Sequence, residues 1–179
     1  ARTGPLFAYQ HYNVKPDIIC CGKGISSSLP LAAVLGRADI LDLPDIGSMS
    51  STHSANPLSC AAGLANLQEI ERLSLVEKST SKGKILHGRL NEMRRRHPKE
   101  ISNILGAGML ASLIFRNSSN VNSASLLASH ICEKAMRKGL LLVHTGRESI
   151  KIGPPLTIPE DALVEGLDVL DEILQECTQ

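Results

Sequence analysis

The sequence predicts an α/β chain in two parts, and three features of the residue pattern point to this class. Near the start, two short apolar runs, 18–21 and 31–35, are separated by glycines and serines, as is typical of buried strands. A long helical stretch covers residues 57–96. From residue 98 onward, short strands alternate with helices, which is the pattern of a small α+β domain.

The first part contains one strong helix start. Asn56 and Pro57 predict it, because asparagine is a favoured N-cap and proline suits the first helical position. The helix is expected to reach Arg72, and its alanines and Gly63 predict close, deep packing against another element. The remaining expected elements are a turn at 2–4, a short helix over 6–12 with Phe7 on its inner side, a helix or turn over 38–43 and a polar loop over 45–50.

The second part begins inside the helical stretch, with a boundary predicted at Leu73 and Ser74. The two parts are therefore expected to be domains of residues 1–73 and 74–179. A last helix over 159–176 carries acidic residues in its first turn and an apolar stripe. The other expected elements are a helix over 75–96, strands over 101–105, 109–115, 140–143 and 149–152, a helix over 123–138 closed by Gly139, and the stripe residues Leu163, Leu167, Leu170 and Leu174.

Composition excludes several classes of partner. The formal net charge is +1 with 21% charged residues, which gives no general attraction to nucleic acid or an anionic membrane. The basic run 94–97 fits the last turn of a helix before Pro98, where cations complement the helix dipole. No apolar run approaches the roughly 18 residues of a membrane span, and no signal-peptide pattern is present. We expect a cytoplasmic protein.

The five cysteines form no metal-binding pattern, and no metal site is expected. They are an odd number, and adjacent Cys20 and Cys21 on a strand would point to opposite faces. Buried, reduced thiols are the better interpretation. The five are Cys20, Cys21, Cys60, Cys132 and Cys177.

Lys23 is the residue best placed for chemistry. It follows the first strand, has glycine on both sides and precedes three serines. A lysine at a strand end, on backbone freed by glycine, can direct its amine into a cleft, which suits a lysine that forms a Schiff base. The alternative is a solvated lysine on a turn.

Five sequence segments occur in a fixed order and together resemble the class III aminotransferases. These are pyridoxal-phosphate enzymes of fold type I, and the resemblance covers essentially all of the chain. The matching segments correspond to the C-terminal half of that family's longer chains. They are 2–8 (RTGPLFA), 15–24 (KPDI leading to GKG), 29–36 (LPLAAVLG), 51–62 (STHSANPLSCAA) and 153–158 (GPPLTI).

The resemblance implies a fold and a first site residue. Residues 1–73 would be the end of the large cofactor-binding domain, and 74–179 the small α+β C-terminal domain. Lys23 would hold pyridoxal 5'-phosphate as a Schiff base and move a proton during catalysis. The family's aspartate that pairs with the pyridine nitrogen would lie upstream of Ala1, so this chain alone is expected to be inactive.

Ser51 and Thr52 match the family's second cofactor-contacting element. The resemblance implies that Thr52 reaches the phosphate of the partner subunit's cofactor, so a homodimer with shared active sites is expected. An ordinary turn before a helix is the alternative. His53 stands where the family usually has an aromatic ring, and Ser54 and Ala55 replace a glycine pair.

The predicted substrate site departs from the family pattern. Many relatives carry arginine at the position of Lys151 and use it to grip a substrate carboxylate, with a fork that lysine cannot reproduce. Lys151 could hold the carboxylate as a point charge, or Arg147 could replace it, or the acceptor binds differently. A solvated strand lysine is the remaining alternative.

Three functions are consistent with these residues. The first is an aminotransferase that moves an amino group between an amine or ω-amino acid and a 2-oxo acid. The second is an aminomutase or racemase of the same fold, which needs no external oxo acid. The third is a non-catalytic binding module derived from the fold, and an intact Lys23 argues against it.

Overall fold

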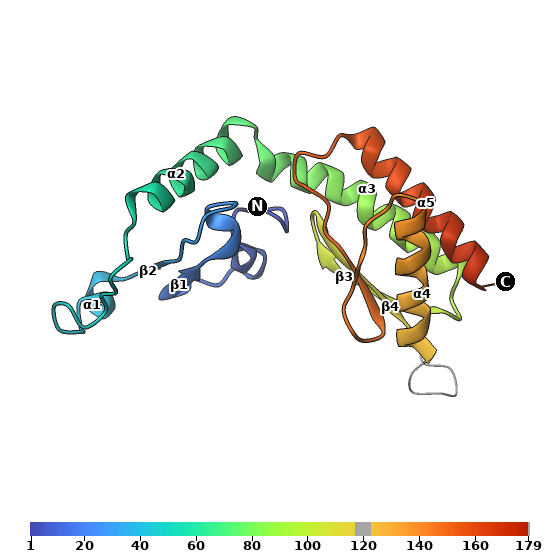
Figure 1. Ribbon diagram of the computed structural model, residues 1–179, viewed down its shortest axis with the longest axis horizontal. Coiled ribbons are helices and arrows are strands. Elements are labelled where there is room, and N and C mark those ends of the chain that lie inside the picture. Colours follow the sequence, from blue (N-terminus) through green and yellow to red (C-terminus); the bar gives the residue numbers. More distant parts are fainter. Residues whose placement is uncertain (117–122, 179) are drawn as a thin grey trace. The chain divides into compact units, whose positions relative to one another are not determined.

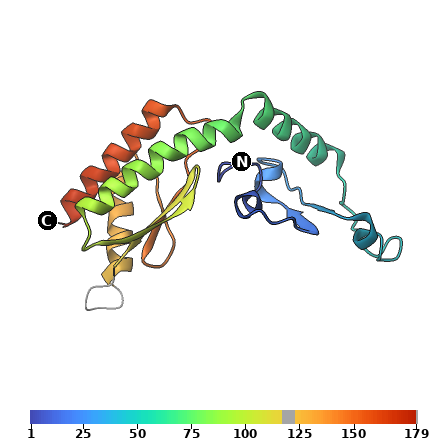
Figure 2. The same ribbon diagram turned by 180° about the vertical axis from the view of Figure 1, so that it is seen from behind.

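A computed structural model describes residues 1–116 and 123–178 (Figures 1 and 2). Its contacts divide the chain into two units. The first unit is Tyr9–Ser74, and the second joins Ala1–Ala8 to the chain from Leu75 onward. The break after Ser74 lies one residue beyond the predicted boundary, and Ala1–Ala8 pack with the second unit.

The first unit contains an antiparallel pair of strands, β1 (Ile18–Cys21) and β2 (Ala33–Gly36). The prediction for β1 is confirmed, whereas β2 starts two residues later than expected. Leu31 instead packs against α2, so the chain enters the ladder only at Ala33. The expectation that these strands are buried is wrong for this chain, because a two-stranded ribbon leaves both faces open; Ile18 is 45% exposed.

Helix α2 (Pro57–Arg72) begins and ends as predicted. The Asn56 side chain caps it, since Oδ1 accepts hydrogen bonds from the amides of Leu58 at 3.0 Å and Ser59 at 3.4 Å. The predicted deep burial is wrong: Ser59 and Gly63 are its buried residues, and Leu58 is 69% exposed. The predicted close approach at Gly63 is confirmed.

The shorter elements of this region also follow the predicted order. The N-terminal helix is a single 3-10 stretch, η1 (Ala8–Tyr12), shorter than expected, with Phe7 half-buried before it. A second 3-10 turn, η2 (Lys23–Ile25), follows β1. The predicted helix or turn over 38–43 is the short helix α1 (Ala38–Leu41).

The second unit is built on a four-stranded antiparallel sheet with the order β3-β4-β6-β5. Three of the predicted strands are confirmed to within two residues at their ends. The expected strand over 140–143 is wrong, because Leu140 packs against Gly166 and the chain joins the sheet only at Val143 and His144. The strands are β3 (Ile101–Ala107), β4 (Leu110–Phe115), β5 (Val143–His144) and β6 (Ser149–Ile152).

Three helices cover one face of this sheet (Figure 1). They are α3 (Leu75–Arg96), α4 (Ser123–Arg137) and α5 (Glu160–Thr178). Gly139 follows α4 with a φ of 84°. Figures 1 and 2 both show α3 and α5 side by side. Alternate residues of β4 face the helices, and the predicted stripe of α5 is fully buried against them. The buried β4 residues are Ala111, Leu113 and Phe115.

The N-terminal segment is held tightly against α3 and the β3–β4 hairpin. The Met109 amide donates to the Arg2 carbonyl at 2.8 Å. A Cβ on Gly108 would lie 2.4 Å from the carbonyl carbon of Thr3, and one on Gly83 would lie 2.6 Å from the Gly108 Cα. Two glycines therefore allow three backbone segments to meet.

All five cysteines are free thiols, but the prediction that they are buried is wrong. Cys20 and Cys60 are exposed, and the other three are half-buried. Burial raises the pKa of the Cys132 thiol. Within residues 1–116 and 123–178, no helix combines the length and the apolar character that a membrane crossing requires.

Candidate active site

Lys23 lies at the end of β1 in a conformation that lysine seldom adopts. Gly22 continues the strand with φ −164° and ψ −166°, and Lys23 then turns the chain into the left-handed region with φ 50°. For an L-residue with a Cβ, this region costs about 1–2 kcal/mol. Such backbone strain persists only where the surrounding structure holds it, and it is common at functional sites.

The Lys23 amine has no partner among the described residues. Its side chain is exposed, and among the described residues its Nζ has no hydrogen-bond or ion-pair partner. It borders an open hollow of about 780 Å³. The hollow is lined by Lys23, Gly24, Ser27, Ser28, Leu29, Pro30, Leu31 and Ala32.

Two side chains of the first unit hold the loop that follows Lys23. Ser26 is 3% exposed, and its hydroxyl donates to the Leu29 carbonyl. Asn66 reaches from α2 and donates through Nδ2 to the carbonyls of Gly24 at 2.9 Å and Ile25 at 3.1 Å. Asn66 was not predicted as a site residue, because its sequence context shows only a polar residue at helical spacing from Ser59 and Gly63.

Ser51 and Thr52 lie in an exposed turn directly before α2. The Ser51 carbonyl accepts from the Ser54 amide at 3.1 Å and the Ser54 hydroxyl at 2.7 Å. Among the described residues, the Thr52 hydroxyl has no hydrogen-bond partner. The amides of Leu58 and Ser59 are already bound by the Asn56 cap, so hydroxyls rather than helix amides are the free donors here.

The five predicted site residues fall into two groups. Lys23, Ser51 and Thr52 belong to the first unit, but the turn at 51–54 does not line the hollow beside Lys23. Lys151 and Arg147 belong to the second unit.

Lys151 projects from the sheet face opposite the helix layer. It lies on β6 between the buried residues Ile150 and Ile152, opposite Ser112 and Val143 in the neighbouring strands. Within residues 1–116 and 123–178, no carboxylate lies within ion-pairing distance of it. Lys151 is also part of the wall of a largely apolar cavity of about 220 Å³, but that cavity is lined by the buried face of α5, on the other side of the sheet from the lysine side chain.

Arg147 has a different environment. It lies in the connection between β5 and β6, and its side chain is 79% exposed. Its Nε lies 3.5 Å from the Glu148 carboxylate. Lys151 therefore offers an unpaired cation on the exposed face of the sheet, and Arg147 offers a solvated, partly paired one.

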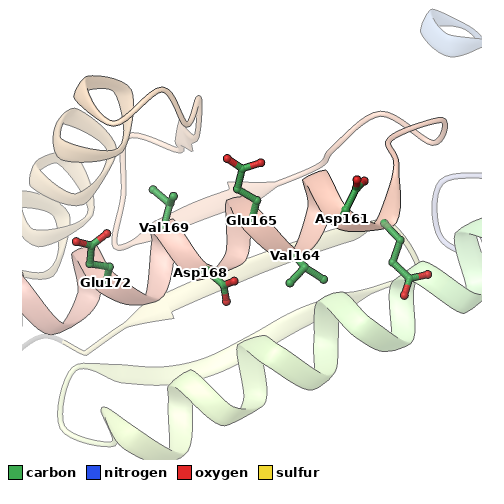
Figure 3. A pocket seen from close by; sticks show the side chains of 7 residues that line it. Asp161, Val164, Glu165, Asp168, Val169 and Glu172 are labelled. Carbon is green, nitrogen blue, oxygen red and sulfur yellow. The ribbon is translucent and has the colours of Figure 1, made fainter.

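A shallow depression along α5 is acidic, but its side chains do not converge on a site. Figure 3 shows Val164 and Asp168 on the side facing α3, with Glu165 and Val169 on the opposite side. Asp168 pairs with Arg89, and Glu172 pairs with Lys138 at 3.0 Å. In the part of the chain that the structure describes, no group of three or more His, Cys, Asp or Glu residues could hold a metal ion.

The chain has matches among known proteins that cover its strands, its lysine turn and its helices. The family model "Aminotransferase class-III" matches residues 1–174. This chain belongs to the class III aminotransferases. The family predicted from the sequence is thereby confirmed.

Several class III aminotransferases and transaminases are similar to the chain. The 4-aminobutyrate aminotransferase of Mycobacterium leprae is 34% identical over 176 residues, which are 97% of this chain and 39% of that relative. The acetylornithine aminotransferase of Caldanaerobacter subterraneus subsp. tengcongensis is 34% identical over 175 residues, 98% of this chain and 42% of that relative. The chain thus spans about 40% of the length of these curated relatives.

The solved structures confirm the predicted fold, the C-terminal part of a fold type I transferase. An S-selective transaminase from Arthrobacter sp. matches with a TM-score of 0.88 and 32% identity, covering 98% of this chain and 41% of that structure. Class III aminotransferases use pyridoxal phosphate. An unpaired Lys23 amine on a strained turn, and exposed hydroxyls at Ser51 and Thr52, fit a cofactor that carries an aldehyde and a phosphate.

Proposed function

We propose that the protein containing this chain moves an amino group between an amine or ω-amino acid and a 2-oxo acid, and that Lys23 is its catalytic residue. The observation that carries this proposal is the glycine-flanked, left-handed Lys23 with an unpaired amine. Curated relatives named for 4-aminobutyrate and acetylornithine support an amino-group donor of this class.

Lys23 has two tasks in this proposal. Its Nζ would hold the cofactor through the aldehyde of that group. When its amine is free and unprotonated, Lys23 would take the proton from the substrate Cα as a general base. Bound pyridoxal phosphate supplies an electron sink for this proton transfer.

Ser51 and Thr52 are proposed to bind the phosphate of the cofactor. Both are exposed, and the Thr52 hydroxyl is unengaged among the described residues. A hydroxyl that donates to a phosphate oxygen forms a charge-assisted hydrogen bond. We further propose a homodimer in which Thr52 serves the partner's cofactor, which makes each active site a shared one.

Lys151 is the residue we favour for the substrate carboxylate. No carboxylate of the described residues neutralises it, whereas Arg147 already lies beside Glu148. An unpaired cation gives up no ion pair when it binds an anion. As a point charge, Lys151 attracts the carboxylate without the bidentate geometry of an arginine.

The cytoplasm is the proposed location of the enzyme. Its five cysteines are all free thiols, which is usual for proteins of a reducing compartment. The proposed partners are accordingly small molecules, an amine donor and a 2-oxo acid acceptor, and neither nucleic acid nor a membrane.

Borohydride trapping of the complete protein tests the proposed function. Wild-type protein is incubated with pyridoxal 5'-phosphate and reduced, and the labelled peptide is identified by mass spectrometry. We expect the label on Lys23 in the wild type and in the control K15A, which removes another exposed lysine of the first unit. K23A should carry no label there and should lose turnover while remaining folded.

Two results would count against this function. One is turnover by K23A at the wild-type rate. The other is amino-group movement without any external 2-oxo acid, which would identify an aminomutase instead.

A further inference from the structure

The strained turn at Lys23 has few hydrogen bonds of its own. Within the turn, the Ile25 amide donates to the Gly22 carbonyl at 3.3 Å, which is a long contact. The flanking glycines add flexibility, because they have no side chain to restrict the backbone. Something outside the turn must therefore hold Lys23 at its φ of 50°.

Asn66 makes the contacts that do so. Its Nδ2 donates to the carbonyl oxygens of Gly24 at 2.9 Å and Ile25 at 3.1 Å. A carboxamide nitrogen carries two hydrogens, so Asn66 can donate to both of the residues that follow Lys23. The contact joins positions that lie 42 and 41 residues apart in the sequence.

The surface of α2 is shaped to bring Asn66 close to this turn. Ser59, Gly63 and Asn66 are spaced by four and three residues, so they lie on one face of the helix. A Cβ on Gly63 would lie 2.5 Å from the Leu31 Cδ2 and 3.7 Å from the Ile25 carbonyl oxygen. Because Gly63 has no side chain, the helix approaches closely enough for a short asparagine to reach the backbone.

We propose that Asn66 is the positioning residue for Lys23, holding the two carbonyls after the lysine so that the amine is presented from a fixed backbone. This role rests on the proposed function of Lys23. Asn66 itself touches neither substrate nor cofactor in this proposal. Since the turn that contains Ser51 and Thr52 leads into α2, the same helix also connects the two proposed cofactor-binding segments.

The test uses three variants of Asn66 in the complete protein. N66L and N66D keep the size of the side chain and remove its donors, while N66Q keeps the carboxamide. N91L and N91D are matched controls, because Asn91 is an exposed asparagine on α3 that donates to the His87 carbonyl at 2.8 Å.

Three measurements report on positioning. Time-resolved borohydride trapping with pyridoxal 5'-phosphate should show Lys23 labelled about tenfold more slowly in N66L and N66D, which is the effect of losing two neutral hydrogen bonds. The kcat should fall by a similar factor while the KM for the 2-oxo acid stays constant. Amide exchange should accelerate in residues 22–31 in protein without cofactor, and N66Q should recover part of each loss.

The outcomes separate this proposal from the proposed function. If Lys23 is labelled in the wild type and N66L and N66D match the Asn91 controls in rate and exchange, the role of Asn66 is wrong and the function of Lys23 stands. If neither variant folds, Asn66 is a general structural requirement and its positioning role is equally overturned. Absence of label on wild-type Lys23 would remove both proposals.

Discussion

At the residue scale, Lys23 and Lys151 share an electrostatic property. Neither has a carboxylate within ion-pairing distance among residues 1–116 and 123–178, whereas Arg37 pairs with Asp39. An unpaired ammonium loses no partner when a ligand binds, so ligand contacts are not offset by a broken ion pair. Both lysines can therefore bind a ligand without first breaking an ion pair.

Replacement of Lys151 should separate it from Arg147. K151A in the complete protein is expected to raise the KM for a carboxylate-bearing substrate by about ten- to hundredfold, the loss of one charge-assisted interaction. R147A should change this KM little, because Arg147 is solvated and lies beside Glu148. Steady-state kinetics of both variants distinguishes the two residues. A larger rise in this KM for R147A than for K151A would assign carboxylate binding to Arg147.

Replacement of Thr52 should weaken cofactor retention without stopping the chemistry. T52A removes one charge-assisted hydrogen bond, so the dissociation constant for pyridoxal phosphate should rise by about tenfold or more. S48A is the control, because Ser48 is an exposed serine that donates to the Asp45 carbonyl at 2.8 Å. Equilibrium binding of the cofactor measures both, and an unchanged constant for T52A would exclude the phosphate role.

At the element scale, α3 contains two glycines with opposite surroundings. Gly88 is exposed, and a Cβ there would have no atom within 4 Å. A Cβ on Gly83 would lie 2.6 Å from Cα, 2.7 Å from C and 2.8 Å from O of Gly108. Backbone atoms cannot move aside as the end of a flexible side chain can. Replacement of glycine by alanine should therefore have opposite effects on stability at these two positions of the helix.

Alanine at these positions should change stability in opposite directions. G88A should raise the free energy of unfolding by about 0.5–1 kcal/mol, the gain in helix propensity. G83A should lower it by about 1–3 kcal/mol, because overpacking against the Gly108 backbone outweighs that gain. Urea denaturation of this chain measures the free energy of unfolding of both variants. An equal increase for the two would contradict the close approach at Gly83.

The contact between α4 and α5 should weaken in acid. Lys138 and Lys134 hydrogen-bond to the Glu176 carboxylate and lower its pKa. A pKa that is lower in the folded than in the unfolded state contributes stability above the unfolded value, and that contribution is lost as the pH falls through the folded pKa.

The E176Q variant tests this acid dependence. Its thermal midpoint should fall less steeply than that of the wild type when the pH is lowered below the ordinary glutamate range. The effect should be small, because the carboxylate is 40% exposed. E165Q on the same helix is the control and should follow the wild-type curve.

At the scale of the whole molecule, burial is distributed unevenly between the two units. Every hydrophobic side chain in the buried core lies in the second unit, between Leu75 and Leu174. The buried residues of Tyr9–Ser74 are Ser26, Ser59 and Gly63. Burial of apolar surface is the main stabilising contribution to folding, so the first unit gains far less from the residues of this chain.

Hydrogen exchange of the 179-residue chain should reflect this difference. Slow amides should be concentrated beyond Leu75, and the segment around Lys23 should exchange fast. Equal protection in both units would contradict the expectation. The chain by itself should show no measurable transaminase turnover; saturable turnover at the rate of the complete enzyme would mean that these residues suffice.

The amino-acid sequence by itself determined the local features of this protein. Asn56 with Pro57 predicts the start of α2, Gly139 the end of α4, and the leucine stripe the buried face of α5. These signals lie within a few residues of the structure that they specify, as caps, φ preferences and side-chain periodicity do. The lysine turn and its place after a strand were recognisable for the same reason.

Only the tertiary structure decided which distant residues meet and which apolar surfaces are covered. The reach of Asn66 to the carbonyls after Lys23, and the packing of Leu140 on Gly166, depend on elements far apart in the sequence. Exposure of β1 and α2 could not be read from their apolar composition, because a side chain is buried only when another element lies against it. For the same reason, Asn66 carries no sequence signal that distinguishes it from a solvated asparagine.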